Sequence, residues 1–253
     1  DPVPGLMPQA STGAVEFRHV SFGYSPEHQL MHDVNITVKS GQKVAIVGPT
    51  GAGKTTLINL LMRFYDVDGG SILVDGVDTK EMTRHELRDR FGMVLQDAWL
   101  FEGSIRDNIA YAQDNLPEEK IIAAARSASV DSFIKTLPGG YDFELSTGAE
   151  NISQGQRQLL TIARAMASDP EIMILDEATS NVDTHTEQLI QKALAKLMHG
   201  RTSFVIAHRL STIRDADMIL YMEHGDILEH GSHEELMAQH GKYEALYMSQ
   251  FAQ

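Results

Sequence analysis

One segment of the chain combines glycines with a lysine and a threonine at a spacing suited to holding phosphate. Residues 48–55 read G-P-T-G-A-G-K-T, which fits the phosphate-loop pattern G-x-x-x-x-G-K-[ST]. Glycines let successive backbone N–H groups turn toward phosphate oxygens, and a helix that starts there adds the partial positive charge of its N-terminus. We therefore expect Lys54 to contact the β- and γ-phosphates and Thr55 to place its hydroxyl on Mg²⁺. The predicted nucleotide contacts are Gly48, Pro49, Thr50, Gly51, Ala52, Gly53, Lys54, Thr55 and Thr56.

Two carboxylates and a histidine follow other apolar runs. Asp176 and Glu177 come directly after residues 172–175, and His208 comes after residues 204–207. An aspartate at the end of an apolar strand is the Walker B form, in which the carboxylate holds Mg²⁺. Glu177 is then placed to orient or deprotonate the attacking water, and His208 can contact the γ-phosphate or that water from the side.

Three short apolar runs must position these side chains. Residues 44–47, 172–175 and 204–207 are each continuously apolar, which is typical of strands buried on both faces of a parallel sheet. Ligands of open α/β sheets bind at the carboxyl ends of the strands. Because each run ends in one of the polar segments above, the sequence predicts a single site at that edge of a sheet.

The rest of the chain divides into regions of different periodicity. Residues 55–65 have apolar positions at helical spacing, and residues 14–41 alternate as antiparallel strands do. Residues 95–168 are helix-like, residues 218–229 predict a hairpin around His224-Gly225, and residues 234–251 predict helices.

The composition excludes several classes of protein. The 253 residues include no cysteine, so disulfides, thiolate metal sites and cysteine nucleophiles are ruled out. The formal net charge of −14 repels nucleic acid and anionic lipid headgroups, so neither is expected as a direct partner. No run of 18 or more apolar residues is present, so the sequence predicts no membrane span.

The nucleotide base is less well determined than the phosphates. No N-K-x-D motif is present, which favours ATP over GTP. Tyr24 lies upstream of the phosphate loop, where its ring can stack on adenine or belong to the core, and spacing alone leaves both readings open.

One further segment carries a resemblance to a known family. Residues 152–158 read I-S-Q-G-Q-R-Q, which looks like the LSGGQ signature, and nearly the whole chain resembles the nucleotide-binding domain of an ABC transporter. The resemblance implies an α/β fold, a P-loop NTPase with a RecA-like parallel-sheet core, an N-terminal antiparallel β subdomain and an α-helical signature subdomain at about 95–168. It also implies a head-to-tail dimer, in which the signature of one subunit faces the γ-phosphate held by the other. The signature residues implied as contacts are Ser153, Gln154, Gly155 and Gln156.

Other positions match the family's motifs singly. By resemblance, Tyr24 is the adenine-stacking aromatic, Gln96 is the Q-loop glutamine that contacts Mg²⁺ and water, and His208 is the switch histidine. Residues 180–183 look like the D-loop, which implies a nucleotide or interface contact for Asp183. The expected catalytic residues are Glu177, His208, Gln96 and Lys54, and the expected Mg²⁺ contacts are Thr55, Gln96 and Asp176.

Two segments are similar to exporter-type domains in particular. Residues 96–109 and 208–212 both resemble motor domains that follow a membrane domain on the same chain. Residues 1–13, rich in proline and glycine, are then expected to be a linker, and residues 14–253 the ATP-binding domain. Residues 99–101 (Trp99, Leu100 and Phe101) would be exposed and dock cytoplasmic coupling helices of the membrane domain, the alternative being that they belong to the core.

Two departures from the family pattern suggest a sub-branch. Gln154 replaces the first glycine of the signature, and residues 147–151 differ from the V-G-E-R-G form, although Glu150 is retained. Homodimer and heterodimer therefore both stay open.

The leading hypothesis is an ATPase of the multidrug or lipid exporter type, at the cytoplasmic face of a membrane and without direct lipid binding of its own. Its expected partners are a second nucleotide-binding domain and the coupling helices. A soluble, non-transport ABC ATPase acting on DNA or ribosomes, a module that traps ATP without hydrolysis, and a small-molecule kinase are the alternatives.

Overall fold

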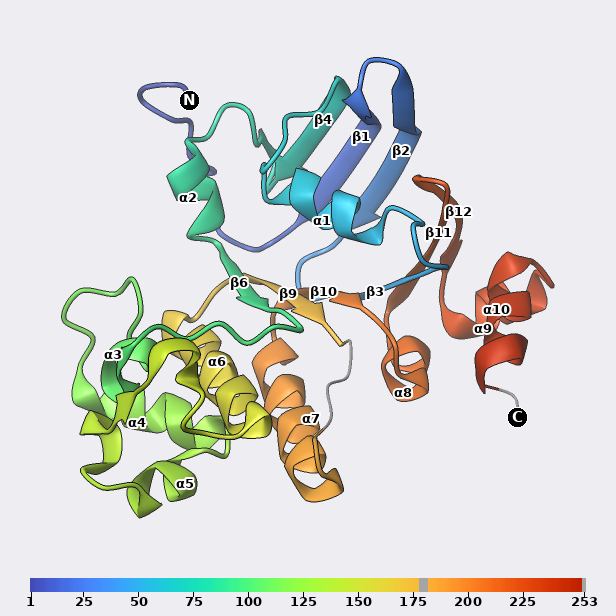
Figure 1. Cartoon of the computed structure of the whole chain (residues 1–253). Helices are drawn as coiled ribbons and strands as arrows, with labels where there is room; N and C mark the ends of the chain where they lie inside the picture. The colour runs from blue at the N-terminus through green and yellow to red at the C-terminus, as the bar shows by residue number, and fades with distance from the viewer. Residues whose placement is uncertain (178–181, 252–253) are drawn as a thin grey trace.

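A six-stranded sheet forms the centre of the part of the chain that the computed structural model describes, residues 1–177 and 182–251 (Figure 1). The strand order is β12-β11-β3-β10-β9-β6, with β11 to β6 parallel and β12 antiparallel at the edge. The three apolar runs are its central strands β3, β10 and β9, which confirms the predicted parallel-sheet core. The strands are β3 (Lys43–Val47), β6 (Phe91–Val94), β9 (Ile172–Asp176), β10 (Thr202–Ile206), β11 (Met218–Glu223) and β12 (Asp226–Gly231).

A second, antiparallel sheet in the order β2-β1-β4-β5 confirms the predicted N-terminal β region. Figure 1 shows α1 (Lys54–Leu61) between the two sheets. Phe17 of the antiparallel sheet, Leu57 of α1 and Phe204 of the central sheet belong to one buried cluster. This packing fixes the helix that follows the phosphate loop. The strands are β1 (Val15–Ser25), β2 (His28–Val38), β4 (Gly69–Val74) and β5 (Val77–Asp78).

The opposite face of the central sheet is covered by helices. Leu159 and Ile162 of α6 and Leu197 of α7 share a second buried cluster with Met173 and Val205 of the sheet. The region predicted as helical from residue 95 begins with an irregular segment, and its first helix starts at residue 105. Its elements are β7 (Gly103–Ser104), α3 (Ile105–Ile109), α4 (Glu118–Ser127), α5 (Asp131–Thr136), the 3₁₀ turns η1 (Gly140–Asp142) and η2 (Thr147–Ala149), β8 (Glu144–Leu145), α6 (Gln154–Ser168) and α7 (Thr184–Met198).

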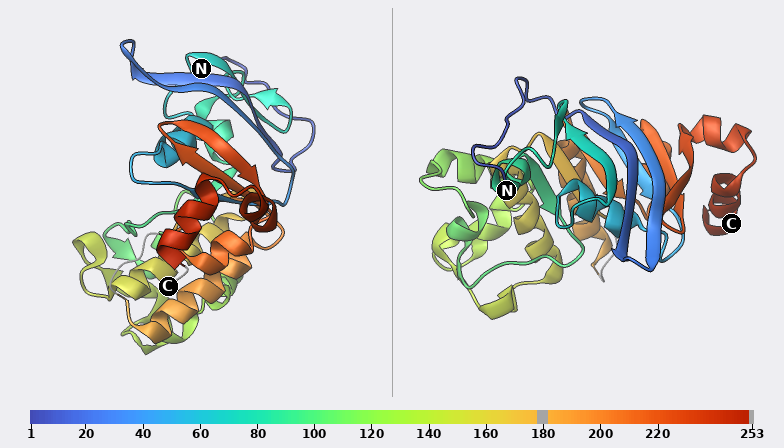
Figure 2. Two further views of the ribbon diagram at one scale, coloured as in Figure 1. Left: turned by 90° about the vertical axis from the view of Figure 1, so that its right-hand side faces the viewer. Right: turned by 90° about the horizontal axis from the view of Figure 1, so that it is seen from above.

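The C-terminal part lies at the other end of the molecule from these helices (Figures 1 and 2). The predicted hairpin of β11 and β12 turns at His224 (φ 52°) and Gly225 (φ 86°), the left-handed pair that a tight two-residue turn requires. None of the helices in the described ranges is long and apolar enough to cross a membrane. The remaining helices are α2 (Arg84–Arg88), α8 (Leu210–Arg214), α9 (His233–Ala238) and α10 (Lys242–Phe251).

The segment predicted as a linker is anchored at its end to the domain. The backbone N–H groups of residues 12–14 donate to the Asp75 carboxylate at 2.9–3.1 Å. Asp75 also pairs with Arg90, whose guanidinium contacts Glu171 at 2.6 Å. Arg90 directly precedes β6, and Glu171 directly precedes β9. Residues 12–14 are therefore tied to the amino ends of two core strands.

Candidate nucleotide-binding and hydrolysis site

The loop between β3 and α1 has a backbone that only glycine accommodates at key points. Gly48, Gly51 and Gly53 have φ values of 152°, 79° and 96°. A Cβ on Gly48 would lie 2.2 Å from the Met222 carbonyl oxygen, too close for any side chain. The loop is therefore shaped by its glycines to expose backbone N–H groups at the start of α1.

Lys54 begins α1 and folds back over the loop. Its Nζ donates to the Gly48 carbonyl at 2.6 Å. Burial lowers the pKa of Lys54, and the nearby Asp176 carboxylate opposes that shift by favouring the charged form. The ammonium thus lies between the phosphate loop and the end of β9, where a polyphosphate would need a positive charge.

Sheet register brings the ends of the three central strands together. Ile206 of β10 pairs with both Ile46 of β3 and Asp176 of β9. The phosphate loop starts two residues after Ile46, and His208 lies two residues after Ile206. The His208 Nε2 is 3.7 Å from the Asp176 Oδ1. The predicted convergence of the three polar segments at one edge of the sheet is what the fold produces.

The oxygen donors at this edge suit magnesium chemically. Thr55 is exposed at the start of α1, and Asp176 ends β9. No group of three or more histidine, cysteine or acidic side chains in residues 1–177 and 182–251 forms a metal cage. Mg²⁺ characteristically takes one or two protein oxygens and completes its shell with phosphates and water, so Thr55 and Asp176 fit that ion.

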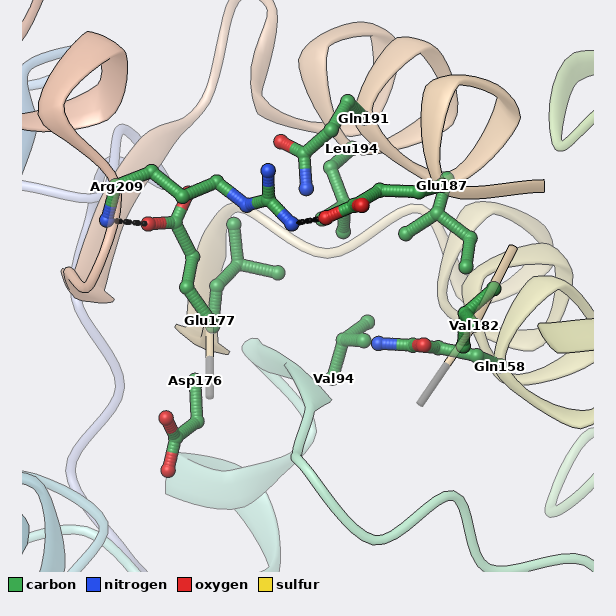
Figure 3. A pocket seen from close by; sticks show the side chains of 11 residues that line it. Val94, Gln158, Asp176, Glu177, Val182, Glu187, Gln191, Leu194 and Arg209 are labelled. Carbon is green, nitrogen blue, oxygen red and sulfur yellow. Dashed lines mark hydrogen bonds and ion pairs between the residues drawn. The ribbon is translucent and has the colours of Figure 1, made fainter. Parts of the chain in front are cut away.

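Glu177 is at the same strand end, but its carboxylate is turned aside. It is 8% exposed and accepts hydrogen bonds from the Thr212 hydroxyl, the His208 N–H at 3.2 Å and the Arg209 N–H at 3.3 Å. Figure 3 shows the Glu177 side chain pointing toward Arg209, away from the side to which Asp176 points. The structure therefore places the predicted base beside the site without aiming it at the phosphate loop.

Gln96 follows β6, the neighbour of β9. Val94 pairs with Leu175 in parallel register, so the exposed Gln96 continues from the strand end next to Asp176. This position agrees with a contact to the nucleotide's metal or water, which remains a prediction.

Tyr24 stands beside α1 with an accessible ring. Its hydroxyl is 2.8 Å from the Thr56 Oγ1, and its side chain is about half exposed. Tyr65 meets it edge-on, with ring centroids 5.2 Å apart. Sequence reasoning missed Tyr65, although an aromatic pair just beyond the phosphate-loop helix was a readable signal. Together they offer an aromatic surface near the loop for a base to stack on.

The signature residues form a well-capped helix start. Ser153 and Gln156 exchange hydrogen bonds in a capping box at the beginning of α6, and Gln154 is exposed. Gly155 is buried, and a Cβ there would lie 2.4 Å from Thr186 of α7. Gly155 is therefore needed for the close contact of α6 with α7. Among the residues that the structure describes, no hydrogen bond or ion pair joins residues 152–158 to residues 48–56.

Asp183 has a local structural role at the start of α7. Its carboxylate accepts the Thr186 N–H at 2.9 Å and thereby caps the helix. The Thr186 hydroxyl donates a second hydrogen bond to the same carboxylate, and the two bonds lower the pKa of Asp183. Residues 180 and 181 of the predicted D-loop lie outside the described residues.

The predicted docking residues 99–101 differ in their exposure. Trp99 is 59% exposed, Phe101 is only partly exposed and Leu100 is 3% exposed, so the expectation of exposure is confirmed for Trp99 and was wrong for Leu100. Leu100 belongs to the core because it packs with the helices of the same region. Trp99, Phe101 and Tyr111 instead form an aromatic patch around Arg164, whose guanidinium lies 5.1 Å from the Tyr111 ring.

These features define a phosphate-loop nucleotide-binding domain with a carboxylate-rich strand end. The model of the ABC transporter family matches residues 31–180, so the chain belongs to that family and is an ATP-binding domain of it. This confirms the resemblance found in the sequence.

Similar proteins include an ABC transporter, a flippase and an ABC exporter. The chain is 55% identical to a fatty acid ABC transporter ATP-binding/permease protein of Mycobacterium tuberculosis, over 92% of this chain and 37% of that protein. It is 50% identical to an ATP-dependent lipid A-core flippase of Desulfotalea psychrophila, over 94% and 41%. A solved bacterial Atm1-family ABC exporter with ATP bound matches with a TM-score of 0.89 and 41% identity, over 99% and 43%. The chain spans about two fifths of the length of these relatives.

Proposed function

We propose that this chain binds ATP with Mg²⁺ and hydrolyses it to drive export through a membrane domain. The observation that carries the proposal is the convergence of Lys54, Asp176, Glu177 and His208 at one edge of the central sheet. The family membership and the exporter relatives support the same activity.

The chain's own residues supply binding, orientation and proton transfer. The loop of residues 48–53 and Lys54 would hold the phosphates, Tyr24 would support the base, and Thr55 and Asp176 would hold Mg²⁺, which offsets phosphate charge when bound. Glu177, turned toward the site, would accept a proton from the attacking water, with His208 placed beside it.

The second nucleotide-binding domain is proposed from the signature. Ser153 and Gln154 are exposed at the start of the fifteen-residue helix α6. The positive end of that helix favours an anion supplied from outside the subunit. A head-to-tail dimer, of like or unlike chains, would meet that requirement with the partner's nucleotide.

Replacing Lys54 with methionine is expected to weaken ATP binding by about 10–100-fold, because the loop loses a charge-assisted contact worth about 1.5–3 kcal/mol. Steady-state phosphate release should fall with it. Isothermal titration calorimetry and a phosphate assay would measure the two effects. Lys39→Met, an exposed lysine beyond β2, is the matched control and should behave as wild type. ATP affinity unchanged in the Lys54 variant would contradict the proposed site.

The aromatic patch of Trp99, Phe101 and Tyr111 is proposed as the dock for the membrane domain, which would place this domain at the cytoplasmic face of the membrane. Trp99 and Tyr111 of this patch are exposed, and large exposed aromatic groups gathered around an arginine are typical of interface hot spots. The names of the relatives support a lipidic or amphipathic compound as cargo.

Trp99→Ser is expected to leave ATP hydrolysis by this chain unchanged and to reduce transport several-fold once the membrane domain is present. The reason is that Trp99 is outside the nucleotide site but contributes the most exposed ring of the patch. Uptake into inverted vesicles, compared with ATP consumption in the same vesicles, separates the two. Phe64→Ser, an exposed aromatic stacked on Arg88 elsewhere, is the control. Equal transport by both variants would place the dock on another surface.

A further inference from the structure

Within the residues that the structure describes, the Glu177 carboxylate takes its hydrogen bonds from one short segment of the chain. The three donors found there belong to residues 208–212, between β10 and the first turn of α8. The Thr212 hydroxyl binds Oε1, and the two backbone N–H groups bind Oε2, so both carboxylate oxygens are occupied. A carboxylate must release such contacts before it can take a proton from a water elsewhere.

The same segment is tied to α7 by an ion pair. The Arg209 Nη2 contacts the Glu187 carboxylate, and Figure 3 shows this pair crossing above the Glu177 side chain. Thr186, the neighbour of Glu187, packs against Gly155 at the start of α6. Contacts therefore run continuously from the signature helix through α7 and Arg209 to the segment that holds Glu177.

This hold is not fully satisfied. Arg209 Nε is buried and has no hydrogen-bond partner within the described residues. An unpaired buried donor costs free energy, so a rearrangement that gave this N–H a partner would be favoured. The arrangement thus combines three hydrogen bonds to Glu177 with an unpaired donor on the arginine that links the holding segment to α7.

We propose that Thr212 is a positioning residue that holds Glu177 turned away from the phosphate loop, in a resting position set by the Arg209–Glu187 pair. This inference rests on the proposed function, since it assigns a resting state to the catalytic base. Movement of α7 against α6 would shift Arg209 and loosen the segment, which frees the carboxylate for hydrolysis.

The test is a comparison of kcat and KM for ATP in hydroxyl variants of α8. Thr212→Val removes the donor at nearly constant volume and is expected to raise kcat roughly tenfold, the effect of losing one hydrogen bond to a charged group. KM should stay within about twofold, because no phosphate contact changes. Thr212→Ser keeps the hydroxyl and should restore the wild-type rate. Ser211→Ala, which removes an exposed hydroxyl from the same helix, is the matched control.

A second variant keeps the test decisive if Thr212→Val fails to fold. Glu187→Gln removes the charge that pairs with Arg209 and leaves the buried contact between Thr212 and Glu177 unchanged. It is expected to raise kcat about twofold to threefold, because the segment that holds Glu177 loses its ion pair to α7. If wild type hydrolyses ATP and the folded variants are no faster, the inference is overturned while the proposed function stands. If neither wild type nor any variant hydrolyses ATP, the proposed function fails and the inference fails with it.

Discussion

Glu177→Gln is expected to reduce ATP turnover by about 10²–10⁴-fold while leaving ATP binding intact, because an amide cannot accept the proton of the attacking water. The substitution fits the observed site. A glutamine Oε1 can accept the His208 and Arg209 N–H groups, and its Nε2 can donate to the Thr212 hydroxyl oxygen. The fold should therefore be kept, so that a loss of turnover reports chemistry. Steady-state phosphate release and calorimetric ATP titration would measure the two quantities.

The same variant should accumulate as a dimer when ATP is added. A nucleotide that binds the closed form best shifts the population toward it, and blocked hydrolysis removes the route back. Light scattering with and without ATP would detect the change in mass. Glu119→Gln, an exposed glutamate on α4, is the control and should resemble wild type. Turnover at the wild-type rate in the Glu177 variant would show that another group is the base.

The central strands were predictable because their physical signal is local. Residues 44–47, 172–175 and 204–207 are continuously apolar since strands in a covered parallel sheet are buried on both faces. The polar segment that ends each strand could then be assigned to a common edge without knowledge of strand order. The phosphate loop was equally readable, because its glycines are required by backbone geometry at fixed positions.

What the sequence could not predict depends on contacts between distant segments. The turn of Glu177 toward Thr212 joins residues 35 positions apart and is a choice of side-chain rotamer. The burial of Leu100 beside the exposed Trp99 depends on which side of an irregular segment meets the helices. Gly155 was expected to face phosphate. The structure shows that a side chain at this position would also collide with Thr186 of α7. None of these leaves a periodic trace in the sequence.

Arg90→Met is expected to destabilise the domain by about 3–5 kcal/mol, the range for removing one partner of a buried ion pair. The side chains of Arg90 and Asp75 are 6% and 3% exposed, so Asp75 would be left buried without a counter-charge. The contacts that link residues 12–14 through Asp75 and Arg90 to the starts of β6 and β9 would weaken as well. Urea unfolding followed by circular dichroism would measure the lost free energy of unfolding. Thermal unfolding of the same variant should show a fall in Tm of about 10 °C.

A control variant and the pH dependence distinguish the cluster of Arg90, Asp75 and Glu171 from an ordinary surface ion pair. Arg18→Met removes an exposed pair with Glu16 and should cost well under about 1 kcal/mol.

Burial alone would raise the pKa of Asp75, but hydrogen bonds from the Thr12 side chain and from the backbone of residues 12–14 outweigh it and hold that pKa below its ordinary value. A carboxyl with a lowered folded-state pKa stabilises the fold above its unfolded value of about 3.9, and this stabilisation disappears as the pH falls through the folded value. Once Asp75 is protonated it carries no charge and needs no counter-charge, so the difference between wild type and Arg90→Met should be complete at pH 7 and shrink as the pH falls below about 4. A difference as small as that of Arg18→Met would mean that the cluster does not hold residues 12–14 to the core strands.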